Sequence, residues 1–151
     1  MLLESLLAYA HIIAILGLVT FLTSEAALCR ADWMNAAVVD RLLRVDRLYL
    51  VAAITVLATG LARTYWGVKG FGWYWSQPLL HVKVGLFVAI GLLSAMPTRA
   101  FFRWKRTLAA SGTLPAAEDV KRARRWIMIE AHALLLVPLA ATMLARGVGT
   151  R

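Results

Sequence analysis

Four apolar windows, each nearly as long as a bilayer is thick, constrain this chain more than any other feature of its sequence. They cover residues 5–28, 49–65, 79–96 and 126–145, and they predict transmembrane helices at about residues 5–28, 47–65, 79–96 and 125–146. A helix needs about 20 residues to cross the hydrocarbon core, because each residue adds roughly 1.5 Å. Helices also satisfy their own backbone hydrogen bonds in lipid. The windows therefore predict an all-α fold: an integral membrane four-helix bundle that forms one domain over residues 1–151.

The composition and the placement of charge agree with a multi-pass membrane protein. Hydrophobic residues make up 61% of the chain, and the formal net charge is +9. The basic residues gather in the connections after the first and third windows: Arg30, Arg41, Arg44, Arg47, Arg99, Arg103, Lys105, Arg106, Lys121, Arg122, Arg124 and Arg125. The positive-inside rule places these connections in the cytoplasm and both termini in the periplasm. We interpret the charge as a topology marker in a bacterial inner membrane, and we expect no nucleic-acid binding.

The acidic side chains near the basic connections are expected at the surface. Asp40 and Asp46 alternate with arginines in a segment that resembles a short amphipathic helix running into the second window. Their mixed charge predicts a solvated face. Glu25, near the end of the first window, is expected to pair with an arginine of the adjoining connection. The single cysteine, Cys29, excludes an intramolecular disulfide and is expected to be a small apolar residue at a helix end.

The third window carries His81 and Lys83 in its first turn, where ionisable groups are costly and often mark a site. Two residues rotate a helix by about 200°, so these side chains lie on opposite sides. With His81 directed inward, Lys83 is expected to extend outward to the interface. In the fourth window, Pro138 predicts a kink, and such kinks often accompany cavities.

His11 and His81 lie at similar membrane depth, within roughly 5 Å of one another at 1.5 Å per residue. Two neutral imidazoles at matching depth can hold a planar macrocycle through its iron, provided that an apolar cavity surrounds it. We therefore predict a haem b site with His11 and His81 as ligands. The alternative is that each histidine simply bonds a neighbouring helix.

Several other side chains fit such a site on the outer side of the membrane. Arg63, Lys69 and Lys83 can balance the carboxylates of a haem. Gly60 can let another helix or a flat cofactor approach the backbone closely, and Trp66 belongs to an aromatic connection over residues 65–78 that can cap an outer cavity.

The expected function is electron transfer or haem-linked redox chemistry, with a quinone or a periplasmic redox partner. A haem-dependent oxidoreductase is a close variant, and a homodimer is an expected way to enclose a large cofactor. The alternative is metal or small-solute transport or homeostasis without haem. In that case a polar path is lined by His11, His81 and Lys83, and it continues inward as a proton path through Glu25, Glu130 and His132. A third possibility is a structural partner whose basic loops recruit proteins or lipids.

The chain resembles a widespread bacterial family of uncharacterised four-helix membrane proteins. The resemblance rests on three runs: DRLYLVAAITVLATGLARTYWGVKGFGWYW, LLHVKVGLFVAIGLLSAMPTRAFFRW and IEAHALLLVPLAATMLARG. More distantly, the phrases AHIIAILGL and HVKVGLF are similar to membrane protoporphyrinogen oxidases, and the layout is similar to copper-resistance membrane proteins. The resemblance to the oxidases implies a haem-binding role for His11 and a match of Lys83 to a lysine near the start of a later helix.

Overall fold

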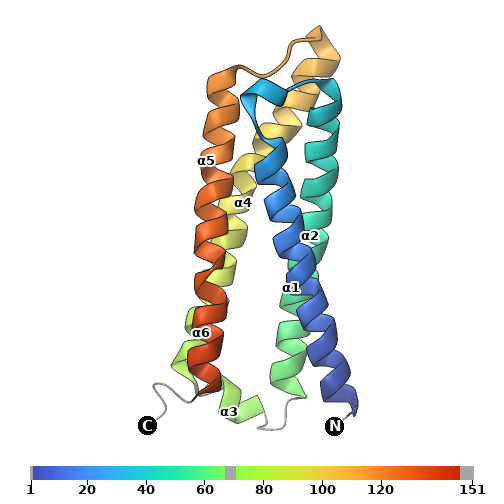
Figure 1. The fold of residues 1–151 in the computed structure, drawn as a ribbon. Helices are drawn as coiled ribbons and strands as arrows, with labels where there is room; N and C mark the ends of the chain where they lie inside the picture. The colour runs from blue at the N-terminus through green and yellow to red at the C-terminus, as the bar shows by residue number, and fades with distance from the viewer. Residues whose placement is uncertain (1, 67–70, 147–151) are drawn as a thin grey trace.

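The computed structural model describes residues 2–66 and 71–146, and within them it contains only helices and loops (Figure 1). The elements are α1 (Leu2–Leu28), the 3-10 helix η1 (Ala31–Trp33), α2 (Ala36–Tyr65), α3 (Phe71–Trp75), α4 (Pro78–Ser111), α5 (Ala117–Leu134) and α6 (Leu136–Ala145). Four stretches are long and apolar enough to cross a membrane: α1, α2, α4 and the α5–α6 pair. The prediction of an all-α bundle with four spanning helices is confirmed.

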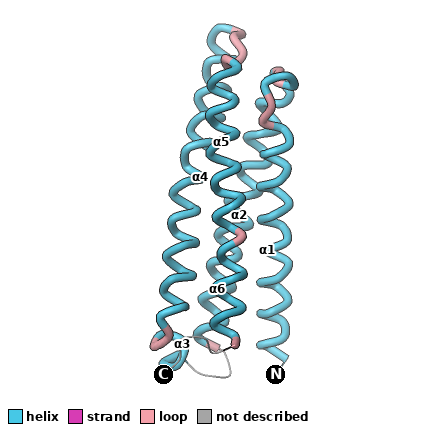
Figure 2. The backbone as a smooth tube through the Cα atoms, turned by 60° about the vertical axis from the view of Figure 1, so that its left-hand side comes forward, coloured by secondary structure: helices cyan, strands magenta, loops and turns pink. Residues whose placement is uncertain are grey.

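The spanning helices run antiparallel to their neighbours in sequence and define two ends of the bundle (Figure 1). The aromatic end holds the start of α1, the end of α6 and the short helix α3. The basic end holds η1 and the connection from α4 to α5. Helix α1 packs chiefly against α2, and α4 packs chiefly against α5 and α6. The bundle therefore consists of two helix layers, α1 with α2 and α4 with α5 and α6. Figure 2 shows the same helices from another side.

The helices at the basic end are longer than the apolar windows. Helix α2 is continuous from Ala36, so the predicted amphipathic segment is its first part and not a separate helix. The Asn35 side chain caps this helix by accepting a hydrogen bond from the Val38 N–H at 3.0 Å. Helix α4 continues through Pro97 to Ser111 and ends at Gly112, whose φ of 68° suits a helix C-terminus. Membrane-length windows thus predict the spans but not these extensions.

The fourth spanning stretch is interrupted where the sequence predicts a kink. Helix α5 ends at Leu134 and α6 begins at Leu136, a few residues before Pro138. Proline has no backbone N–H, and its ring clashes with the carbonyl of the residue four positions earlier, which is Leu134 here. At the break, the Leu135 N–H donates to the carbonyl of His132, three residues earlier, at 3.2 Å, and not to the residue four positions earlier as in a regular α-helix. The kink prediction is confirmed as a break between two helices.

Side-chain burial differs between the two halves of the bundle. Toward the basic end, a tight core contains fully buried Phe101, Leu42 and Ile127. Elsewhere along the spans large apolar side chains remain exposed, including Leu16, Leu50 and Leu92. Exposed apolar surface on helices of membrane length is the surface that contacts lipid.

Cys29 follows α1 directly and is fully buried. Its Sγ lies 3.7 Å from the Val120 carbonyl oxygen of α5. Burial raises the pKa of the Cys29 thiol to about 12, so the thiol stays protonated and unreactive at neutral pH. The predicted structural role at a helix end agrees with this placement.

Truncation of Phe101 should strongly lower the stability of the basic-end core, because it leaves an empty space there. The centroid of the Phe101 ring lies 5.5 Å from that of the Trp104 ring. We expect Phe101→Ala to cost about 3–5 kcal/mol, because the rigid core cannot refill the space. The adjacent Phe102 is exposed, so Phe102→Ala should change stability by no more than about 0.5 kcal/mol. Thermal denaturation of both variants in mild detergent measures the difference, and equal melting temperatures would contradict this account of the core.

Candidate functional site

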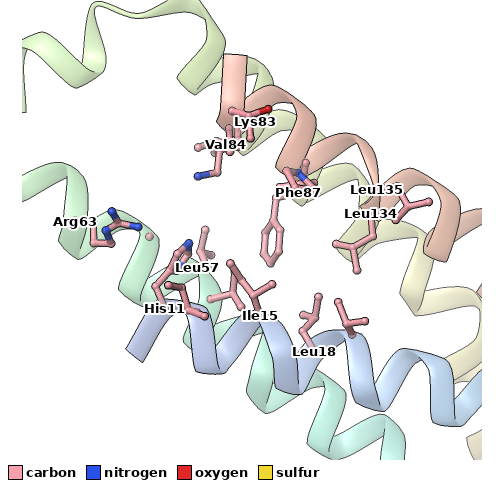
Figure 3. Close-up of a pocket in the computed structure, with 18 of the residues that line it drawn as sticks. His11, Ile15, Leu18, Leu57, Arg63, Lys83, Val84, Phe87, Leu134 and Leu135 are labelled. Atoms are coloured by element: carbon pink, nitrogen blue, oxygen red, sulfur yellow. The ribbon is translucent and has the colours of Figure 1, made fainter. Parts of the chain in front are cut away.

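A cavity of about 630 Å³ lies between the two helix layers, toward the aromatic end of the bundle. Every spanning helix contributes to its walls, and Trp75 of α3 contributes at the aromatic end. Most of the lining is aliphatic or aromatic, and Figure 3 shows Ile15, Leu18, Leu57, Val84, Phe87, Leu134 and Leu135 among the residues that surround the space. The volume is within the roughly 300–1,000 Å³ typical of small-molecule sites.

His11 reaches this cavity from α1 and has a fixed orientation. Its Nδ1 lies 2.8 Å from the Thr59 Oγ1 on α2. The Thr59 hydroxyl itself donates to the Thr55 carbonyl at 2.6 Å, as threonines in helices commonly do. Thr59 Oγ1 therefore accepts from Nδ1–H of the neutral ring, which leaves the lone pair on His11 Nε2. A histidine held through Nδ1 in this way presents Nε2 as a ligand atom.

Gly60 makes room for His11. A Cβ atom at position 60 would lie 3.3 Å from the His11 Cε1, closer than most packed side chains tolerate. The close approach that the sequence predicted at Gly60 is thus made by the His11 ring. The glycine allows α1 and α2 to hold an imidazole between them beside the cavity.

Two cations line the same cavity: Arg63 from α2 and Lys83 from α4. They interact electrostatically with each other and with His11, so the three basic groups form one corner of the cavity. Neither Arg63 nor Lys83 takes part in a salt bridge with any residue that the structure describes. We call the pair Arg63 and Lys83, which lie beside the neutral His11 ring, the cationic corner. Lys69, the third predicted cation, lies outside the described residues.

The structure reverses the predicted orientations of His81 and Lys83. The two side chains do lie on different sides of α4, but Lys83 lines the cavity while His81 is exposed. The His81 ring packs against Trp75, with 5.7 Å between ring centroids, and its Nδ1 lies 3.1 Å from the Gln77 carbonyl oxygen. Helical spacing fixes the angle between two residues but not which of them faces inward. His11 and His81 are therefore not brought together in one cavity.

The aromatic connection contributes less to the cavity than the sequence suggested. Trp66 is exposed, and its ring contacts that of Tyr65 at 5.1 Å. Of the tryptophans, Trp75 lines the cavity beside Leu80. Trp66 is therefore placed at the surface of the aromatic end.

The three residues of the predicted proton path occupy two different places. His132 lines the cavity, and its Nδ1 lies 2.6 Å from the Met128 carbonyl oxygen. Glu25 and Glu130 do not line the cavity; both are buried deeper in the bundle. Glu25 forms no salt bridge in the described part of the chain, so the expected pairing with a loop arginine is wrong. The reason is that Glu25 lies on the buried side of α1 with Leu18 and Leu22.

Sequence reasoning missed the groups that surround these two glutamates. Asp46 was expected on a solvated face but is 5% exposed, and its Oδ1 accepts a hydrogen bond from the Thr98 hydroxyl at 2.6 Å. The Tyr49 hydroxyl donates to Glu130 Oε1. The sequence does contain a pattern that predicts this burial. Asp46 and Tyr49 continue the apolar stripe of Val39 and Leu42 at helical spacing. Asp40 does lie at the surface, in a salt bridge with Lys105.

Over residues 2–66 and 71–146, no three side chains of the histidine, cysteine, aspartate and glutamate types are grouped to hold a metal ion. The candidate site is therefore an apolar cavity with one oriented histidine and a cationic corner.

These features define a multi-pass helical membrane protein with an intramembrane cavity. The chain belongs to the DUF2214 family of predicted membrane proteins, whose model matches residues 3–149. No curated protein and no solved structure shows a significant match to it.

The bond between His11 and Thr59 can be tested without any ligand. In protein labelled with ¹⁵N-histidine, we expect the His11 signals of an Nδ1–H tautomer, assigned by their absence in His11→Gln. Thr59→Val keeps the side-chain shape but removes the acceptor, so the tautomer should shift or become mixed. Thr55→Val is the matched control, because the Thr55 hydroxyl bonds the Val51 carbonyl of its own helix. An unchanged spectrum in Thr59→Val would exclude the proposed orientation.

Proposed function

We propose that this protein binds haem b in the cavity and uses it in electron transfer or haem-linked redox chemistry. The observation that supports the proposal best is the His11 imidazole, held by Thr59 with its Nε2 lone pair available beside an apolar cavity. Haem b, when bound, supplies an iron centre that accepts and releases an electron.

The residues around the cavity suit such a ligand. A macrocycle with an apolar face and carboxylate substituents needs aliphatic walls and cations at one edge. The walls contain Leu18, Leu57 and Phe87, and the cationic corner places Arg63 and Lys83 next to His11. His11 is the proposed iron ligand, and the two cations hold the carboxylates and exclude other orientations.

The pairing of His11 with His81 as two ligands of one iron remains a hypothesis. Because His81 is exposed on α4, the pairing is compatible with a homodimer in which the second histidine comes from another copy of the chain. The resemblance of the AHIIAILGL phrase to membrane protoporphyrinogen oxidases also favours His11 as the haem-binding residue.

We further propose that the basic end faces the cytoplasm of a bacterial inner membrane, following the positive-inside rule. The aromatic end, with both termini, then faces the periplasm. In this orientation the cationic corner lies in the outer half of the membrane, near a quinone or a periplasmic redox partner.

The alternative proposal is a transport or homeostasis protein for a metal or small solute, without haem. It is favoured by the reach of the cavity, which extends from His11 on α1 to His132 on α5. A solute with an anionic group suits the same cationic corner.

An absorption spectrum separates the two proposals. After haem-replete expression and purification in mild detergent, we expect reduced-minus-oxidised bands of a b-type haem that disappear in His11→Ala, because the iron loses its ligand. His132→Ala, which alters the same cavity at another point, is the matched control and should keep the bands. Loss of the bands in His81→Ala as well would support the two-copy arrangement.

A colourless protein that also fails to take up added haem would contradict the haem proposal. Solute flux into proteoliposomes that is lost in His132→Ala would then favour transport.

The cationic corner gives a second test. Charge-assisted hydrogen bonds contribute about 1.5–3 kcal/mol each, so Arg63→Gln and Lys83→Gln should each weaken haem binding about tenfold or more. Titration of the apoprotein with haem in detergent measures the dissociation constants. Lys105→Gln is the control, since Lys105 pairs with Asp40 at the basic end. Unchanged affinity in both cavity variants would show that these cations do not bind the ligand.

A further inference from the structure

Three carboxyl groups from three different helices are buried inside the bundle, between the cavity and the basic end. They are Glu25 of α1, Asp46 of α2 and Glu130 of α5, with exposed fractions of 2%, 5% and 1%. Each interacts electrostatically with at least one of the others. None lines the cavity, but Leu22 and Ala131, which neighbour Glu25 and Glu130 along their helices, do line it. The cluster thus lies next to the inner end of the cavity.

Two of the three carboxyl groups accept a hydrogen bond from a hydroxyl group on another helix. Glu130 accepts from the Tyr49 hydroxyl, and Asp46 accepts from the Thr98 hydroxyl. Glu25 Oε1, by contrast, is buried without a hydrogen-bond partner among the described residues. A buried polar atom without a partner is unusual in a native structure and requires an explanation.

The cations near the cluster form no salt bridge with it in the described part of the chain. On α5, the Arg124 guanidinium donates to the backbone carbonyls of Ala26 and Cys29, which follow Glu25 on α1. On α2, Arg47 interacts electrostatically with Asp46 but is itself exposed. Helix α4 contributes the uncharged Thr98 to this cluster.

Three ionised carboxylates in this environment would be very unfavourable, because burial removes the water that stabilises charge and the like charges repel. Protons remove both costs. A metal ion is a poorer explanation, since no suitable ligand group occurs among the residues of known position. A protonated Glu25 carboxyl group carries no charge and has an O–H that can donate a hydrogen bond.

We propose that Glu25, Asp46 and Glu130 form a buried proton-binding site, in which Glu25 is a neutral carboxylic acid at pH 7. Tyr49 and Thr98 stabilise the partner carboxyl groups by donating hydrogen bonds to them. Release returns one proton from the Glu25 carboxyl to water and leaves a carboxylate. The site lies beside the cavity and does not depend on haem. We therefore expect it to be present whichever ligand the cavity binds.

Infrared spectroscopy of the purified protein in detergent tests the proposal directly. Protonated carboxylic acids give a carbonyl stretching band that is separate from the carboxylate bands and shifts in D₂O. We expect this band at pH 7 in the parent protein and expect Glu25→Gln to remove it. Glu118→Gln is the matched control, because Glu118 is exposed and paired with Lys121, and it should leave the band unchanged.

A second measurement covers the case in which Glu25→Gln does not fold. Parent protein labelled with ¹³C-glutamate should show the same band at a lower frequency, whereas ¹³C-aspartate should leave it in place. Absence of a protonated carboxyl band at pH 7, a band that persists in Glu25→Gln, or a shift only with labelled aspartate would overturn the proposal. The infrared measurements can be made equally well on protein that contains no haem. Their outcome therefore tests this proposal separately from the haem proposal.

Discussion

Polar contacts to a single helix, α2, hold the spanning helices in their positions. In lipid, burial of apolar surface does not drive helices to associate, because lipid tails are equally apolar. Close packing and interhelical hydrogen bonds therefore determine the arrangement. Thr59 of α2 bonds His11 of α1, Asp46 accepts from Thr98 of α4, and Tyr49 donates to Glu130 of α5. One helix therefore has a polar contact with each of the other three spans, and these contacts also form the edges of both sites proposed above.

The two sites carry opposite charge at different depths. Toward the aromatic end, Arg63 and Lys83 lie in an apolar cavity without acidic partners in the described chain. Deeper in the bundle, Glu25, Asp46 and Glu130 are buried, and none of them forms a salt bridge within residues 2–66 and 71–146. Such separation is costly unless each group of charges is compensated, by an anionic ligand in the first case and by protons in the second.

The sequence was sufficient to predict the four spans, the break before Pro138 and the close approach at Gly60, because each follows from local chemistry. The spans follow from the length of the apolar windows, the break from the missing N–H of proline, and the close approach from the missing Cβ of glycine. The sequence was insufficient wherever the rotation of a helix about its axis decided the outcome. His81 and Lys83 were placed correctly relative to each other, yet the inward side was chosen wrongly. Asp46 was misread for a related reason, since its charge suggested solvent whereas its position on the stripe of Val39 and Leu42 indicated burial. Which face turns inward depends on the partners that pack against it, and those come from distant parts of the chain.

The interruption at Leu135 divides the fourth span into two helices at the wall of the cavity. Leu134 and Leu135 both border the cavity, while Glu130 lies on the uninterrupted side of the break. Bending costs least where the helical hydrogen bonds are broken, so a tilt of α6 relative to α5 at this joint would change the width of the cavity.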